Sequence, residues 1–327
     1  MTRPTAAGLR RATVVALGLA LLAACGSEGG AATPTHLPAI EAAGHAGHEG
    51  HETAGPSAGA IGPTRYRGPQ GRVGQFVVHC PFSHSSSDDP IVFYGQPGAA
   101  HRHDFYGATG TDSRSTAANL LEGETTCDKS VDTAAYWQPS LIDHGRAVTP
   151  TGISAYYRAA PGVDPTAVEP MPLGLMLIAG DHSATRPQRG EAAGWACGVS
   201  TTLSDDPPQC SMGAPLHLVL TFQDCWDGKQ LDSVDHRAHV AYSAHGSCPG
   251  SHPVHLPQLT VSIAFPIYGA GHELSLSSGS IYSAHGDFLN GWQPKGMARE
   301  VDDCIHRDAV CDLGSNRAEE PLFSLGV

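Results

Sequence analysis

Short segments in which apolar and polar residues alternate are the main pattern of this sequence. The alternation is clearest in residues 216–222 and 259–268, and further apolar runs cover residues 73–79, 173–179 and 239–243. A period of two turns successive side chains to opposite faces of a strand, so that one face can enter a core. Clusters of proline, glycine, asparagine and aspartate separate the runs, which is typical of loops. The pattern predicts an all-β fold, a β-sandwich or jelly-roll-like single domain with long loops.

The first residues carry the signature of an export signal. Three arginines precede an apolar run over residues 12–24, as in a secretory signal peptide. The run ends in Leu-Ala-Ala-Cys, which resembles the bacterial lipobox, and its cysteine is Cys25. We therefore expect residues 1–24 to be a lipoprotein signal peptide. Lipidated Cys25 would anchor the protein, extracytoplasmically, to the outer face of the cell membrane. An ordinary signal peptide with an incidental cysteine is the alternative.

Residues 25–68 lack the large apolar residues that a core requires. We expect them to form a lipidated, disordered tether ahead of a globular domain over residues 69–327. Within the tether, His45, His48 and His51 recur at every third position. A histidine-rich tract can gather a divalent metal, although a solvated linker of this composition needs no such role.

Composition and charge exclude several classes of protein. The chain of 327 residues has 19 Lys and Arg against 32 Asp and Glu, which gives a formal charge of −13. An acidic chain without basic clusters cannot neutralise phosphates, so we expect no nucleic acid as a partner. The 39 glycines and 25 prolines argue against a helical bundle, and only residues 113–121 suggest a helix, which would be short. The sequence leaves the oligomeric state open.

The cysteines point to an oxidising compartment. Eight remain when Cys25 is set aside, an even number, and no Cys-x-x-Cys pair occurs. These features favour a disulfide framework over a zinc ribbon or a thioredoxin-like redox site. Connectivity does not follow from sequence alone, and we take pairing in sequential order as the expectation. The expected disulfides are Cys80–Cys127, Cys197–Cys210, Cys225–Cys248 and Cys304–Cys311.

The 19 histidines equal the lysines and arginines in number, and several of them stand close to one another or to aspartates. In a strand, His101 and His103 would point to the same face, which is a common way of giving two imidazoles to one metal. We expect His239 and His285 to complete this site, with zinc or copper as the ion. For any single histidine, a role as a hydrogen-bonded fastener of loops is the alternative.

The same segments offer groups for proton transfer. His103, His236 and Asp287 are the candidate catalytic acids and bases, and Asp235 and Asp287 could orient imidazoles or bind the metal directly. These groups could act with a metal or without one.

A sugar substrate would need a binding platform as well as catalytic groups. Aromatic rings stack on the apolar faces of sugars, and amides hydrogen-bond to their hydroxyl groups. The candidate substrate-binding residues are therefore Tyr136, Trp137, Asn290 and Trp292.

Several short segments follow one another along the chain in a characteristic order. They are Asp89-Pro90-Ile91-Val92, Gly95-Gln96-Pro97-Gly98, His101-x-His103-x-Phe105-x-Gly107, Thr125-Thr126-Cys127, Ala135-Tyr136-Trp137-x-Pro139, Cys225-Trp226-Asp227-Gly228, Asp235-His236-x-x-His239-Val240-Ala241-Tyr242, Cys248-Pro249 and His285-x-Asp287-Phe288-x-Asn290-Gly291-Trp292. In this order they resemble the domain-of-unknown-function family numbered nineteen ninety-six, found in secreted proteins of actinobacteria and fungi. The resemblance covers about residues 75–304. In fungi the domain sometimes stands beside WSC carbohydrate-binding modules, which implies an association with wall polysaccharide and no defined activity.

These observations lead to one main hypothesis and two alternatives. The main hypothesis is an extracytoplasmic lipoprotein of unknown biochemical activity, whose His/Asp site binds a metal and acts on, or binds, cell-envelope polysaccharide. One alternative is a non-catalytic copper- or zinc-binding lipoprotein, helped by the tether histidines. The other is a structural module of the cell wall. Whether the protein is an enzyme stays open at this point, as do the metal and the substrate.

Overall fold

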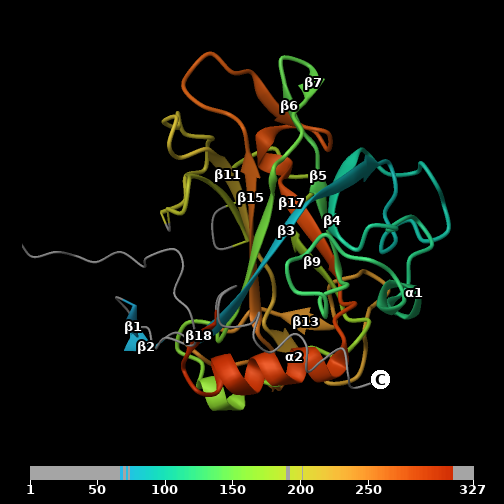
Figure 1. Cartoon of the computed structure of the whole chain (residues 1–327), viewed down its shortest axis with the longest axis vertical. Coiled ribbons are helices and arrows are strands. Elements are labelled where there is room, and N and C mark those ends of the chain that lie inside the picture. The colour runs from blue at the N-terminus through green and yellow to red at the C-terminus, as the bar shows by residue number, and fades with distance from the viewer. Residues whose placement is uncertain (1–66, 69–70, 73, 189–191, 201, 312–327) are drawn as a thin grey trace, which may run out of the picture. The chain divides into compact units, whose positions relative to one another are not determined.

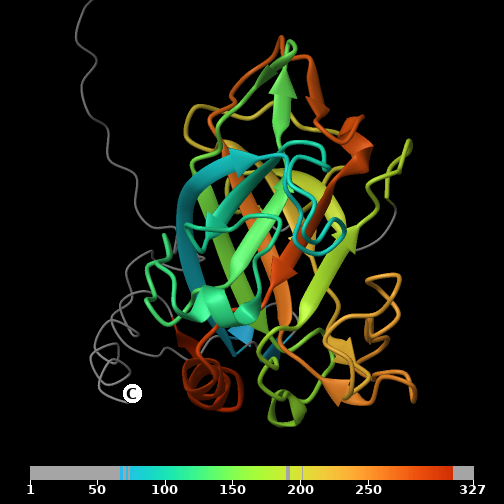
Figure 2. The ribbon, with the colours of Figure 1, turned by 90° about the vertical axis from the view of Figure 1, so that its right-hand side faces the viewer.

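Strand β3 (Gln75–Ser86) is 12 residues long and belongs to both halves of the main sheet. Around Phe82 it stops pairing with β8 (Gly152–Arg158) and starts pairing with β4 (His103–Gly107), and its register shifts between Phe82 and His84. Figure 1 and Figure 2 show this long strand in blue. The order across the sheet is β10 (Ala193–Cys197), β11 (Leu216–Thr221), β15 (Gln258–Phe265), β8, β3, β4, β5 (Ala135–Pro139), β17 (His285–Leu289) and β9 (Met176–Gly180). All these pairings are antiparallel, and only β18 (Val310–Cys311) adds to β3 in parallel.

The structure is a computed structural model and describes residues 67–68, 71–72, 74–188, 192–200 and 202–311. All of them lie in one compact unit, residues 54–327. The expected signal peptide, the lipidation site Cys25 and the tether histidines lie outside the described residues.

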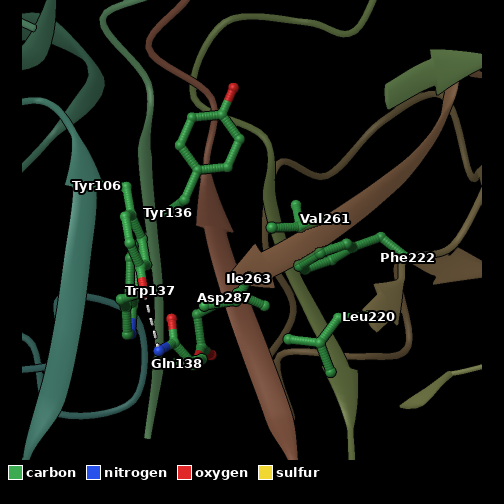
Figure 3. A pocket seen from close by; sticks show the side chains of 9 residues that line it. All are labelled: Tyr106, Tyr136, Trp137, Gln138, Leu220, Phe222, Val261, Ile263 and Asp287. Atoms are coloured by element: carbon green, nitrogen blue, oxygen red, sulfur yellow. Dashed lines mark hydrogen bonds between the residues drawn. The ribbon is translucent and has the colours of Figure 1, made fainter. Parts of the chain in front are cut away.

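The two halves of the sheet pack face to face. In β11, every second side chain is buried, beginning with Leu216, and β8 alternates in the same way. Phe222 from one half meets Phe288 from the other, with ring centroids 6.4 Å apart. Side chains of both halves line the narrow internal space drawn in Figure 3. The predicted all-β class is confirmed, and the alternating runs do supply the core of a sandwich.

Shorter strands and turns border these two halves. Residues 239–243, expected as a strand, contribute only the two residues of β13, and residues 173–179 enter a strand only from Met176. The short elements are β1 (Arg67–Gly68), β2 (Gly71–Arg72), β6 (Leu141–Asp143), β7 (Arg146–Ala147), β12 (Cys225–Trp226), β13 (Val240–Ala241), β14 (Val254–His255), β16 (Leu274–Leu276), and the 3₁₀ turns η1 (Pro165–Ala167) and η2 (Ile281–Ser283).

The described residues form two α-helices, of which only one was expected. The predicted short helix is α1 (Ala117–Leu121), which begins with a capping box at Thr116. The second is α2 (Pro294–Glu300), which continues as the π-helical turn η3 (Val301–Ile305) below the sheet in Figure 1. Its sequence begins Pro-Lys-Gly and has no side-chain cap, so its stability comes from packing of its buried side chains. No helix of the described part is long and apolar enough to cross a membrane.

All four disulfides expected from sequential pairing are present: Cys80–Cys127, Cys197–Cys210, Cys225–Cys248 and Cys304–Cys311. The first joins residues 47 apart in the sequence and ties β3 to the long loop before β5. Four such bonds in one chain indicate an extracytoplasmic location, because cytosolic thiols are kept reduced.

A second, smaller core covers the outer face of the β4–β5–β17–β9 half. Side chains from these strands pack there against Ile91 of the loop before β4 and Leu120 of α1. Every residue of β4, β5 and β17 is therefore buried, on both faces of the sheet. This cover encloses polar side chains that an open sheet would expose to solvent.

Candidate metal centre

Two strands that are not neighbours begin with the two most buried histidines of the centre. His103 opens β4 and His285 opens β17, with β5 between them. The ring centroids of these two histidines lie 6.0 Å apart, and the ring of His101 lies 4.2 Å from His103 and 5.0 Å from His285. One ligand atom from each of the three lies within 4.8 Å of the other two. We call His101, His103 and His285 the imidazole centre; the sequence analysis expected these three to meet together with His239, and the structure brings the three together without it.

Backbone carbonyls fix the tautomer of the two strand histidines. Nδ1 of His103 lies 2.9 Å from the carbonyl oxygen of Asp88, and Nδ1 of His285 lies 2.9 Å from that of Ser283. A carbonyl only accepts, so both Nδ1 atoms carry the proton and both Nε2 atoms keep a free lone pair. Nε2 of His103 and Nε2 of His101 are buried, and neither has a hydrogen-bond partner among the described residues. Such buried, unpaired nitrogens require an explanation, and a bound ion supplies one.

Two carboxylates adjoin the centre at His103. Ligand atoms of Asp89, His103 and Asp287 also lie within 4.8 Å of one another, and both aspartates are buried. Asp89 caps its own turn, with Oδ1 accepting from the backbone N–H groups of Ile91 and Val92 at 2.9 Å. Asp287 has one buried oxygen without a hydrogen-bond partner in the described structure, and Figure 3 shows its side chain beside the neighbouring strand β5.

Burial opposes charge on all of these side chains. It lowers the pKa of His103 well below its usual value and lowers the pKa of His285 to about 3. Burial also lowers the pKa of His101, and it raises the pKa of Asp89 and, to a greater extent, that of Asp287. The imidazoles are therefore neutral near pH 7, which is the form that binds a metal.

Two further histidines, His182 and His236, lie near the centre. The exposed ring of His182 lies 6.0 Å from that of His285. Nδ1 of His236 lies 2.8 Å from a carboxylate oxygen of Asp232, and His236 adopts a left-handed backbone with φ of 57°. Its charge also acts on Asp89, so His236 lies near the centre and outside it. His182 is in no motif, and only the overall abundance of histidine could have drawn attention to it.

Two residues expected at the site have structural roles instead. His239 is not part of the imidazole centre, because its Nδ1 contacts the Ser233 hydroxyl at 3.0 Å and its Nε2 donates to the Met176 carbonyl at 2.7 Å. Asp235 orients no imidazole, since its Oδ1 accepts from the Ser233 hydroxyl and from two backbone N–H groups of its own loop. The carboxylate that orients His236 is Asp232.

The expected sugar platform is enclosed in the core. The side chains of Tyr136, Trp137 and Trp292 are 2%, 2% and 0% exposed, so in this structure none offers a ring face for stacking. Trp292 donates to the hydroxyl of Tyr157, which in turn contacts that of Tyr136. Asn290 is also buried and donates to the carbonyls of two residues in the loop before β9. The aromatic segments are therefore elements of the fold.

Two other groups of potential ligands contain disulfide-bonded cysteines. One joins Cys225 and Cys248 to His255, and the other joins Cys80 and Cys127 to Asp132. Metals bind the thiolate, which an intact disulfide does not provide. The imidazole centre and its two aspartates are thus the metal-ligand set to consider.

Sequence comparison covers most of this region. A profile of the family described as Domain of unknown function (DUF1996) matches residues 89–292. The chain belongs to this family. The matched residues include the whole imidazole centre as well as Asp89 and Asp287, so the candidate metal centre lies within this domain. No curated protein and no solved structure matches the chain significantly.

Proposed function

We propose that this protein is an extracytoplasmic lipoprotein whose imidazole centre binds one zinc or copper ion. The observation that carries the proposal is the meeting of three neutral imidazoles, two of which have a buried Nε2 without a partner in the described structure. Neutral imidazole suits both ions. In a tetrahedral site with Zn–N bonds near ~2.0 Å, the ligand nitrogens stand about 3.3 Å apart, so the three rings need move only slightly to close on an ion.

The carboxylates give the centre a second capability. Asp89 or Asp287 could supply a fourth ligand, or could accept a proton from a ligand bound at the ion, because both approach His103. His101 is only partly buried, so the centre has an accessible side where an exchangeable ligand can enter. Three protein ligands with an open position are typical of catalytic sites, and closed four-ligand sites are typical of structural ones.

The expected location supports a ligand from the cell envelope. Anchoring through Cys25 would place the protein among envelope polymers, and we propose one of these polysaccharides as the ligand of the centre. Mass spectrometry of the mature N-terminus tests the anchor: a diacylated Cys25 is expected, and an unmodified terminus or cleavage elsewhere would contradict it.

Metal content is the direct test of the centre. The mature chain is prepared with His45, His48 and His51 replaced by alanine, so that tether histidines cannot contribute. After chelation, reloading with Zn²⁺ or Cu²⁺ and removal of free metal, elemental analysis should find about one ion per chain. His101→Ala, whose side chain is only partly buried, should reduce retention to background without loss of the fold.

A matched control separates this site from histidines in general. His217 is also half-buried, with Nδ1 2.7 Å from the Ser262 hydroxyl, and lies on the other half of the sheet. His217→Ala should retain the ion. Equal retention by His101→Ala and the parent, or no retention by the parent, would contradict the proposal.

A further inference from the structure

The guanidinium of Arg237 is fixed to the edge of the sheet directly beside the centre. Its Nη2 donates to the carbonyl of Gly180 at 2.7 Å, and its Nη1 donates to that of Ile178 at 3.4 Å. In the β9–β17 ladder, Gly180 is the partner of His285, and Ile178 is the partner of Asp287. The sheet register therefore holds this cation alongside two residues of the site.

The guanidinium of Arg237 forms no ion pair with a carboxylate of the described residues, and Asp181 at the end of β9 is close enough only to feel its charge. The two carbonyls occupy two of its five N–H donors and leave three for another group. Its charge also acts on the centre, because it opposes the rise that burial causes in the pKa of Asp287 and adds slightly to the fall in the pKa of His285. A rigid, partly exposed guanidinium with free donors is a binding element for a negatively charged oxygen group.

We propose that Arg237 and the imidazole centre together bind a carboxylate-bearing sugar, a uronic acid residue within an envelope polysaccharide. This inference rests on the proposed function, since one carboxylate oxygen would face the bound ion and the other would face Arg237. A neutral sugar would offer no charged acceptor to the three remaining N–H donors of the guanidinium. A phosphate group presents similar oxygens, and the test below distinguishes it from a carboxylate.

Isothermal titration of the zinc-loaded mature chain, with the tether histidines replaced, provides the test. The probes are oligogalacturonate, the neutral oligogalactose of equal length, and inorganic phosphate. We expect oligogalacturonate to bind at least about tenfold more tightly than the other two, a difference that one charge-assisted contact can supply. Arg237→Gln should remove that preference, and Arg237→Lys should retain part of it because the charge remains.

Arg102→Gln is the matched control, since it also removes the positive charge of an exposed arginine, one that stands in the sequence between two histidines of the centre. The Arg102 side chain is 45% exposed, and its Nη2 lies 4.0 Å from Asp104 and not at the β9 edge. This variant should keep the preference for oligogalacturonate.

Zinc content is measured in the same samples, so an effect on sugar binding can be distinguished from an effect on metal binding. Equal affinity for charged and neutral sugars, or an unchanged preference in Arg237→Gln with normal zinc content, overturns the inference. Tighter binding of phosphate overturns the assignment to a sugar acid, and loss of zinc in Arg237→Gln shows that Arg237 supports the centre instead. A parent chain without zinc contradicts the proposed function alone, and its titration with the three probes still decides the role of Arg237.

Discussion

His103 and Asp287 come from strands separated by β5, and each presents a buried polar atom that has no hydrogen-bond partner in the described structure. A ligand atom of each lies within 4.8 Å of the other and of Asp89. Burying unpaired polar groups costs free energy, which a bound ion or an ordered ligand would recover. This relationship marks the end of the β4–β5–β17–β9 half as the candidate binding site of the fold.

His239 should matter for stability and not for metal binding. His239→Ala removes two hydrogen bonds from a fully buried ring and leaves a cavity, so we expect the free energy of unfolding to fall by about 2–4 kcal/mol. Urea denaturation measures this loss, and elemental analysis of the folded variant should find the parental metal content. Loss of the metal from a variant that is still folded would show that His239 contributes to the metal site.

The stability of the protein should depend on pH through Asp132. Burial raises the pKa of this carboxyl from 3.8 to about 7, although it accepts hydrogen bonds from the Tyr136 hydroxyl and the Ala134 N–H. The folded state therefore binds the proton more tightly than the unfolded state. The contribution of this proton to the free energy of unfolding is fully present below about pH 4 and is lost as the pH rises to about 7. At most about 4 kcal/mol is involved.

Asp132→Asn cannot titrate, so the difference in unfolding free energy between the wild type and this variant should fall between about pH 4 and pH 7. Asp143→Asn is the control with the opposite sign. The pKa of Asp143 is lowered, mainly by its hydrogen bond to His272, so its contribution is lost as pH falls. Parallel pH profiles for the wild type and Asp132→Asn would contradict the raised pKa.

A buried ion pair joins the loop before β5 to α2. Nζ of Lys129 lies 2.6 Å from Oε1 of Glu300, and the two residues are 1% and 4% exposed. Lys129→Met should lower the free energy of unfolding by about 3–5 kcal/mol, because it leaves a buried carboxylate without its cation. The double variant Lys129→Met/Glu300→Leu should be more stable than the single variant, since it removes both charges. Urea denaturation of the three proteins checks this order. A double variant with a lower free energy of unfolding than Lys129→Met would contradict it.

The candidate site was only partly predictable. The His-x-His spacing indicated that His101 and His103 belong together, and they do, with His285 as the third member. His239 stands in an equally suggestive segment, but its ring connects its own loop to β9 through hydrogen bonds. A spacing of residues cannot show which hydrogen bonds a ring already makes, and both nitrogens of His239 are occupied.

The aromatic residues show the same limit. From the sequence, large aromatic rings could belong either to a sugar-binding surface or to the hydrophobic core, because they serve both purposes. The burial of Tyr136, Trp137 and Trp292 shows that they belong to the core. Arg237 attracted no attention in the sequence, since its position beside His285 depends on the pairing of β9 with β17.

The sequence by itself determined the class of the fold and its covalent framework. Alternation with a period of two is a local property, so it predicted the strands, and an even number of cysteines in an exported chain predicted the disulfides. Only the tertiary structure decided which polar residues meet. The pairing of strands distant in sequence brings His101, His103, His285 and the two aspartates together, and burial then keeps the imidazoles neutral. These contacts depend on the register in which distant strands pair and on the loops that cover the sheet. The residues involved are separated by more than 180 positions in the sequence, and a local pattern carries no information about such pairings.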